Sequence, residues 1–134
     1  MHPMLRRAAA TVLAAALTAP VVAAAMPMDV VVLQALDKIT ARVSTLEVPI
    51  NGTIQFGTLH ITARHCDKRP PEEPPESAAF LEIVETRPDE EPVERFTGWM
   101  FASSPALSAL EHPVYDLWVI DCRNASSSES GTSG

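Results

Sequence analysis

Apolar and polar residues alternate in short runs along most of the chain after residue 28, which is the pattern of half-buried β-strands. A β-branched apolar run follows Asp29, and the stretch 53–66 switches phase at Gly57-Thr58, where a bulge or tight turn is expected. The predicted strands cover residues 29–36, 39–43, 46–50, 53–66, 78–85, 93–101 and 114–122.

Turn signals separate these runs. Residues 49–52 end in Asn51-Gly52, a pair that tolerates positive φ. Residues 67–77 contain four prolines and three glutamates, so we expect an extended and exposed loop there. A second turn is predicted at residues 87–92, because Pro88 and Pro92 flank a run of acidic residues there.

One short helix is predicted from Pro105 to Leu110, because Ser104 is a suitable N-cap and proline is favoured at the first helical position. No long amphipathic helix is available to cover a parallel sheet. The pattern therefore predicts an all-β fold, mainly β with one short helix: a small antiparallel sandwich or barrel, built as a single β domain over residues 26–123. Residues 124–134 are rich in serine and glycine, and we expect a disordered tail.

The first 25 residues differ from the rest. Arg6 and Arg7 precede an uncharged stretch, rich in alanine, valine and leucine, that ends at Ala25 with small residues. This order is typical of a secretory signal peptide cleaved after Ala25, and a retained membrane anchor is the alternative. We therefore expect a periplasmic protein of a Gram-negative envelope, with no stable membrane insertion after the signal is cleaved.

Charge narrows the possible partners. The chain has 10 basic and 17 acidic residues, a net charge of −7, and cleavage of the signal would remove two of the basic residues. An acidic surface repels nucleic acid, so no nucleic-acid partner is expected. The expected partner is an envelope protein or a cell-wall component.

Cys66 and Cys122 are the two cysteines of the chain. In an oxidising compartment they are expected to pair, and a disulfide that closes so long a loop stabilises a domain by roughly 4 kcal/mol. A redox-active pair, a metal site and an intermolecular bridge are the alternatives. The first usually needs a Cys-x-x-Cys spacing, which is absent, and the second needs more ligands than two cysteines provide.

Other residues invite catalytic or metal-binding hypotheses. His112 and Asp116 with Ser103 or Ser104 contain the residue types of a hydrolase, but the Gly-x-Ser-x-Gly turn is absent. His60 and His65 lie five residues apart, which places them on opposite faces of a regular strand. Glu82, Glu85 and Glu94 of the predicted strands could supply the carboxylate pair of a glycosidase, but glutamates in such strands usually form a solvated face. We predict no catalytic residue, no metal and no cofactor.

Four aromatic residues, namely Trp99, Phe101, Tyr115 and Trp118, lie on the predicted strands that flank the short helix. Such residues belong either to the core or to a binding face. The corner between helix and last strand is our first choice for a binding surface, because loops on a rigid scaffold often carry function. The candidate surface consists of His112, Tyr115, Asp116, Trp118 and Trp99.

Several runs resemble one bacterial family. They are GWMFASSPALSALEHPVYDLWVIDC over 98–122, KRPPEEPPESAAFLEI over 68–83, LDKITARV over 36–43 and FGTLHIT over 56–62. Together they resemble the family called domain of unknown function 2155, small secreted proteins of Gram-negative bacteria, over about Val32 to Cys122. Both cysteines match the family pattern. The resemblance implies export and a single domain, and it brings no activity and no catalytic residues.

These observations support two main hypotheses. The first is a non-catalytic envelope module that binds a partner through the candidate surface. The second is a periplasmic enzyme that acts on the cell wall, or an inhibitor of such an enzyme, which rests on analogy of fold alone. A purely structural envelope component is a third.

Overall fold

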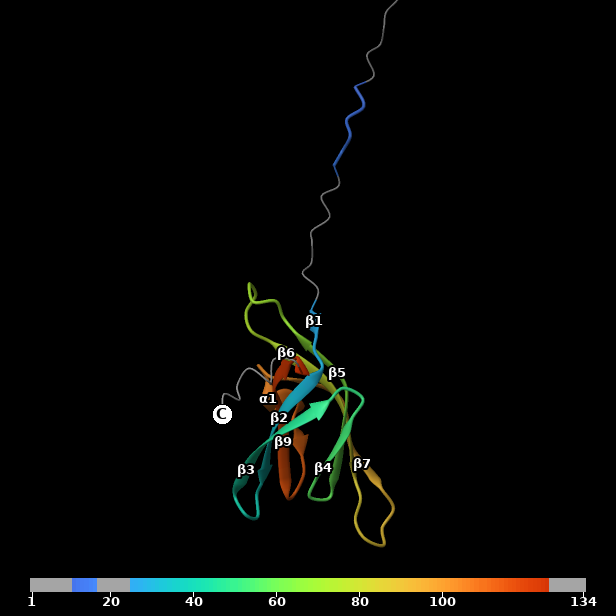
Figure 1. The fold of residues 1–134 in the computed structure, drawn as a ribbon, viewed down its shortest axis with the longest axis vertical. Coiled ribbons are helices and arrows are strands. Elements are labelled where there is room, and N and C mark those ends of the chain that lie inside the picture. The colour runs from blue at the N-terminus through green and yellow to red at the C-terminus, as the bar shows by residue number, and fades with distance from the viewer. Residues whose placement is uncertain (1–10, 17–24, 126–134) are drawn as a thin grey trace, which may run out of the picture.

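A computed structural model describes residues 11–16 and 25–125 of the chain (Figure 1). The described part is mainly β. Its elements are β1 (Met26–Pro27), β2 (Val30–Asp37), β3 (Arg42–Pro49), β4 (Thr53–Phe56), β5 (Leu59–Lys68), β6 (Ser77–Glu85), β7 (Val93–Phe101), α1 (Pro105–Ser108), β8 (Leu110–Glu111) and β9 (Tyr115–Arg123). The predicted signal peptide lies largely outside the described residues, as does the predicted tail beyond Ala125.

The strands form two antiparallel sheets. One has the order β1-β5-β6-β7, with β4 paired to β5 as well, and the other has the order β3-β2-β9-β8. The prediction of an antiparallel all-β fold is therefore confirmed. Both sheets end in edge strands, so the alternative of a closed barrel is wrong. The turns of the β2–β3, β4–β5 and β6–β7 hairpins lie at one end of the molecule, and β1 lies at the other (Figure 1).

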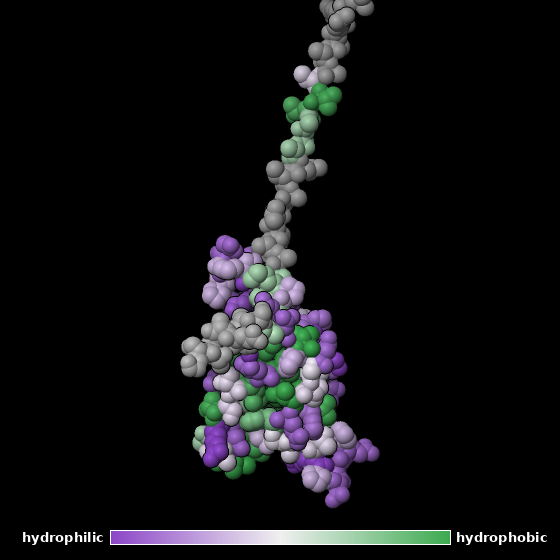
Figure 2. All heavy atoms as spheres, viewed as in Figure 1, coloured by the Kyte–Doolittle hydropathy of each residue, from purple (hydrophilic) through white to green (hydrophobic). Residues whose placement is uncertain are grey.

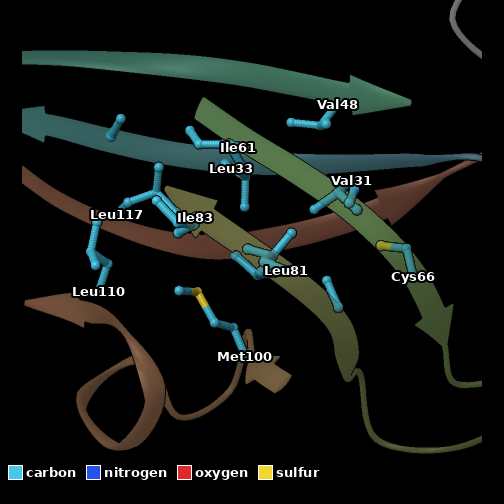
Figure 3. Close-up of a cluster of buried hydrophobic side chains, with 14 of the residues drawn as sticks. Val31, Leu33, Val48, Ile61, Cys66, Leu81, Ile83, Met100, Leu110 and Leu117 are labelled. Carbon is cyan, nitrogen blue, oxygen red and sulfur yellow. The ribbon is translucent and has the colours of Figure 1, made fainter. Parts of the chain in front are cut away.

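A single core lies between the two sheets (Figure 3). Leu33 from β2 and Leu117 from β9 meet Ile61 from β5 and Leu81 from β6, and all four are fully buried. Burial of each such side chain stabilises the fold by about 1.5–3 kcal/mol relative to exposure. Strand β6 alternates strictly between buried and partly exposed residues, so its inward positions can be read from the sequence period of two.

The connection between β2 and β3 differs from the prediction. Residues 39–43 were expected to form a strand, but 38–41 form a turn and Ile39 is 77% exposed. Asp37 explains the difference, because its Oδ1 accepts hydrogen bonds from the backbone N–H groups of Ile39 (2.9 Å) and Thr40 (3.2 Å). These two local hydrogen bonds, together with the positive φ of Ala41 (58°), favour a turn over the strand that the weak alternation of residues 39–43 predicts.

Other predicted turns are confirmed. Asn51 has a φ of 62° in the turn before β4, and Gly57 has a φ of 57° in the β4–β5 turn. The proline-rich loop is shorter than expected, because β5 extends to Lys68 and β6 begins at Ser77. Hydrophilic side chains cover this loop and the tip of the β6–β7 hairpin (Figure 2).

The helix is shorter than predicted. It spans Pro105–Ser108, and Ser104 occupies the N-cap position without a side-chain cap hydrogen bond. Leu107 is 85% exposed, whereas Leu110 is buried in β8 next to β9. Leu107 and Leu110 therefore do not share a helical face, because the pairing of β8 with β9 ends the helix before Leu110. No helix among the described residues is long and apolar enough to cross a membrane.

Candidate functional site

Glu85 is a buried carboxylate at the end of β6. The alternation that points Leu81 and Ile83 into the core points Glu85 inward as well, and the residue is 2% exposed. A charge in such a place is costly unless it has partners. Thr58 Oγ1 donates to Glu85 Oε2 at 2.6 Å, and Arg95 donates to Oε1 through Nε (3.0 Å) and an amino group (2.7 Å).

His112 is the partner of Glu85 from the other sheet. Its Nδ1 accepts hydrogen bonds from the backbone N–H of Val114 (3.0 Å) and that of Tyr115 (3.4 Å), so this nitrogen carries no proton. The proton is therefore on Nε2, which lies 2.9 Å from Glu85 Oε2. The Lys38 ammonium donates to the backbone oxygen of His112 at 2.8 Å, which fixes the backbone of this segment as well.

The surroundings of Glu85 keep it ionised. Burial by itself raises the pKa of this carboxyl, but hydrogen bonds from Thr58, His112 and Arg95 outweigh burial and lower the pKa from 4.5 to about 2. The side chains of His112 and Glu85 are 1% and 2% exposed, so a substrate reaches neither without local opening. Their arrangement fits a structural link between the sheets better than acid–base catalysis.

A row of aromatic rings lies on the outer face of the sheet formed by β5, β6 and β7. His65 of β5, Phe80 of β6 and Trp99 of β7 are register partners on three adjacent strands, and we call these three residues the aromatic row. The rings of Phe80 and Trp99 meet edge to face at 5.5 Å between centroids, and those of His65 and Trp99 are nearly parallel at 6.0 Å. Trp99 is 40% exposed and Phe101, two residues further along β7, is 41% exposed.

A bulge in β5 places His65 in this row. The register with β6 shifts between Ala63 and His65, so Arg64 and His65 both face outward before Cys66 returns to the core. The prediction that His60 and His65 lie on opposite faces is therefore wrong, because the bulge adds one residue between them. His60 pairs with the outward-facing Val84 on the same side of the sheet as His65.

A shallow depression of about 440 Å³ lies beside the aromatic row. It is lined by the three rings together with Asn51 and Arg64. Glu82 orients the Arg64 guanidinium, because its Oε2 accepts bonds of 3.2 Å from Nε and from one amino group. The other amino group lies 3.5 Å from Asn51 Oδ1. The depression therefore joins aromatic rings to an amide and a guanidinium held in place.

The structure divides the five residues predicted as a binding surface. His112 is buried, and its ring stacks on that of Tyr115 at 5.3 Å. Asp116 is nearby and pairs with Lys38 at 3.0 Å. Trp118, between buried neighbours on β9, faces outward from one sheet, whereas Trp99 faces outward from the other. The binding role of these residues stays a prediction.

The residue sets considered for catalysis are dispersed. The Ser103 hydroxyl donates to Glu76, which also accepts the Ser103 backbone N–H at 3.0 Å, while both ring nitrogens of His112 bond elsewhere. Glu85 is buried, but Glu82 on the same strand faces outward. No cluster of three or more histidine, cysteine or acidic residues suited to a metal ion occurs within residues 11–16 and 25–125.

Cys66 and Cys122 form a disulfide that joins β5 of one sheet to β9 of the other. Their Cα atoms are 5.7 Å apart and both residues are buried. The bond directly follows His65, so it anchors the strand that carries one end of the aromatic row. The Glu85–His112 pair joins the same two sheets near the opposite ends of β5 and β9, where Thr58 precedes β5 and Tyr115 begins β9.

The sequence pattern does not predict the Glu85–His112 pair, because the two residues lie 27 positions apart and on different sheets. The sequence does contain a signal for the burial of Glu85. Glu85 occupies the same strand phase as Leu81 and Ile83, and a carboxylate at an inward position demands buried partners. The aromatic row was missed because it depends on the bulge at Arg64 and on the register of three strands.

Comparisons with known proteins place the chain in a family. Residues 31–122 match the model of domain of unknown function 2155, described as an uncharacterised protein conserved in bacteria. An uncharacterised protein of Rickettsia prowazekii (strain Madrid E) is 34% identical over 88 residues, which are 66% of this chain and 57% of that protein. The chain therefore spans little more than half the length of this relative. No solved structure matches. Since the family model covers most of the chain, including both cysteines and the whole aromatic row, the chain belongs to the family of domain of unknown function 2155.

Proposed function

We propose that the chain is an exported envelope protein, a non-catalytic module that binds a partner through the aromatic row. The observation that carries this proposal is the alignment of three rings across three adjacent strands with Trp99 40% exposed. Large aromatic side chains left at a surface are costly in water, and tryptophan is among the residues that contribute most to binding energy. Export is supported by the pattern of the first 25 residues.

The scaffold around the row is suited to binding without rearrangement. The three residues lie on paired strands rather than on loops, and the Cys66–Cys122 disulfide directly follows His65. A surface held in its bound conformation loses little entropy when a partner arrives. Trp99 is the residue of the predicted surface that this proposal retains, and the others lie on or near the opposite sheet.

The alternative of an enzyme that acts on the cell wall, or of an enzyme inhibitor, has less support. An acid–base mechanism needs titratable groups within reach of a substrate. Glu85, whose pKa is lowered to about 2, is enclosed by protein donors, and His112 uses both ring nitrogens in bonds to protein atoms. A catalytic site in the depression beside Trp99 would need a nucleophile or an acid–base pair. The residues that line this depression supply neither.

The test is cosedimentation of the purified mature protein with a washed envelope preparation. Wild-type protein is expected to sediment with the envelope, and Trp99→Ala is expected to reduce the bound fraction at least tenfold. Ile39→Ala, which removes an exposed apolar side chain from the β2–β3 turn, serves as the matched control and should bind normally. Trp118→Ala distinguishes the aromatic row from the surface predicted around His112 and Tyr115. If Trp118→Ala alone reduced the bound fraction, the predicted surface would be favoured over the aromatic row. Equal binding by all variants, or no binding at all, would refute the proposal.

A further inference from the structure

The ring geometry of the aromatic row limits what it can bind. The planes of His65 and Trp99 differ by 19°, while the Phe80 ring stands nearly perpendicular to both, at 76° and 78°. Phe80 lies between the two in the strand register and supports them from the middle strand. The 40% exposed Trp99 thus offers a ligand an indole whose π-density attracts the weakly positive C–H groups of an apolar surface.

Polar groups border the rings on one side. The Asn51 amide both donates and accepts hydrogen bonds, and the Arg64 guanidinium is a planar donor oriented by Glu82. The next register row on the same face consists of Thr62, Glu82 and Thr97, which continues the polar border along three strands. A ligand that fits must therefore have one flat apolar face and a rim of hydroxyl or amide groups.

Charge selects among ligands with this shape. The pairing of Arg64 with Glu82 at 3.2 Å leaves the depression without a dominant charge, and the chain as a whole has a net charge of −7. Anionic polymers such as nucleic acid are repelled by the whole molecule. A cationic ligand would find no carboxylate among the residues that line the depression, so cation–π attraction to the rings alone would hold it. A neutral polar ligand is left as the best match.

We infer that the depression lined by Asn51, Arg64 and Trp99 binds a pyranose unit of a neutral glycan chain. A pyranose has the required form, because its ring C–H groups make a flat apolar face and its hydroxyls and amides project from the rim. The volume of about 440 Å³ lies within the range of small-molecule sites, and the depression is open so that a chain can continue along the sheet. This inference rests on the proposed function, and it gives that function a ligand class.

The experiment uses the two tryptophans of the chain as probes. The side-chain indole N–H signals of Trp99 and Trp118 are assigned in an ¹H–¹⁵N spectrum with Trp→Phe variants, and the mature protein is titrated with N-acetylglucosamine oligosaccharides. The Trp99 signal is expected to move and saturate while the Trp118 signal stays in place. In parallel, the protein is sedimented with protein-free peptidoglycan sacculi. Trp99→Ala should lower the bound fraction at least tenfold, Trp99→Phe should restore part of it, and Ile39→Ala should bind as wild type does.

The outcomes separate this inference from the proposed function. Failure of the Trp99 signal to move, together with no binding to sacculi, would overturn the glycan assignment. If the envelope preparation still binds in a Trp99-dependent way, the proposed function stands and the ligand is a protein or a lipid. If Trp99 matters in neither assay, both are refuted. Circular dichroism and thermal unfolding of each variant show whether a loss of binding reflects a loss of fold.

Discussion

Nε2 of His112 lies 2.9 Å from Oε2 of Glu85, and both side chains are almost fully buried between the two sheets. The pair connects the end of β6 to the segment that leads into β9, so it joins strands of different sheets. The Cys66–Cys122 disulfide joins the same sheets further along β5 and β9. The sheets are thus held together by a buried hydrogen bond at one end and by a covalent bond at the other.

Glu85→Gln is expected to lower the free energy of unfolding by about 3 kcal/mol, because breaking a buried charge pair leaves Arg95 and His112 without their anionic partner. Urea unfolding followed by circular dichroism measures the change. Glu82→Gln on the same strand is the matched control. Its carboxylate pairs with Arg64 at the surface, so its loss should cost at most about 1 kcal/mol. Equal shifts of the two unfolding midpoints would contradict the structural role of Glu85.

Acid should destabilise the fold over a defined range. The pKa of Glu85 is held at about 2 in the folded protein, below its ordinary value of 4.5, so the folded state binds this proton less readily than the unfolded chain does. Its contribution to stability is complete above pH 4.5 and is lost as the pH falls toward 2. Burial raises the pKa of Glu76, but hydrogen bonds from Ser103 and Ser77 bring it below its ordinary value, so Glu76 adds to the loss in the same direction.

The measurement is the urea midpoint of wild type and Glu85→Gln between pH 7 and pH 2. The wild-type midpoint should fall steeply below pH 4.5, while the variant should start lower and fall less, since it lacks the Glu85 carboxylate and keeps Glu76. Parallel curves for the two proteins would show that Glu85 has the same pKa in the folded and unfolded states.

Loss of the disulfide should destabilise the fold without changing its architecture. The bond closes a loop with a sequence separation of 56, for which the chain-entropy model gives roughly 4 kcal/mol. Cys66→Ala with Cys122→Ala removes the bond and both sulfur atoms from the core, so the measured loss should be at least this large. A native far-ultraviolet spectrum with a lower thermal midpoint is the expected result. An unchanged midpoint would indicate that the Glu85–His112 pair and the core suffice.

Export should leave a defined N-terminus. If the signal peptide is cleaved after Ala25, protein recovered from the periplasm begins at Met26, and its intact mass identifies that end directly. Replacing Ala25 with a bulky residue such as leucine should leave the longer form in the membrane fraction. The retained anchor is the competing hypothesis, and wild-type protein that stays full-length in the membrane would support it.

The strand pattern could be predicted because a period of two is a local property. The limits predicted for β7 agree with Val93–Phe101, and β6 was placed to within one residue at its start. Features that depend on contacts between distant residues could not be predicted in this way. The outward position of His65 depends on a bulge set by pairing with β6, and the turn at Ile39 depends on a side-chain bond from Asp37.

The candidate site was predictable to a smaller extent. Trp99 belonged to the predicted surface, but the sequence offers no local sign that His65 and Phe80 are its register partners. His112 was predicted to belong to a binding surface because it lies at the corner between the predicted helix and the last strand. In the structure His112 is buried, and its Nε2 lies 2.9 Å from the buried carboxylate of Glu85, a contact that no local pattern predicts.

Gly57→Ala should destabilise the fold through two separate effects. Gly57 has a φ of 57°, where a side chain is strained, and a Cβ built there would overlap the Tyr115 hydroxyl. Tyr115 cannot move freely, because its ring packs on Phe56 at 5.3 Å and on His112 at 5.3 Å. We expect a loss of about 1–3 kcal/mol, of which the backbone strain alone accounts for about 1 kcal/mol.

A double-mutant cycle with Tyr115→Ala separates the two effects. In the Tyr115→Ala background the overlap is removed, so Gly57→Ala should cost only the backbone strain, and the difference between the two costs is the coupling free energy. Gly52→Ala provides a comparison at a glycine where the new Cβ would approach Pro49, at 3.0 Å from its backbone oxygen and at 3.4 and 3.5 Å from two of its side-chain carbons. If Gly57→Ala costs the same with and without the Tyr115 ring, the overlap with that ring does not contribute to the cost of the substitution. The expected result is a positive coupling, since Tyr115 fills the space that the glycine leaves and covers the buried imidazole of His112.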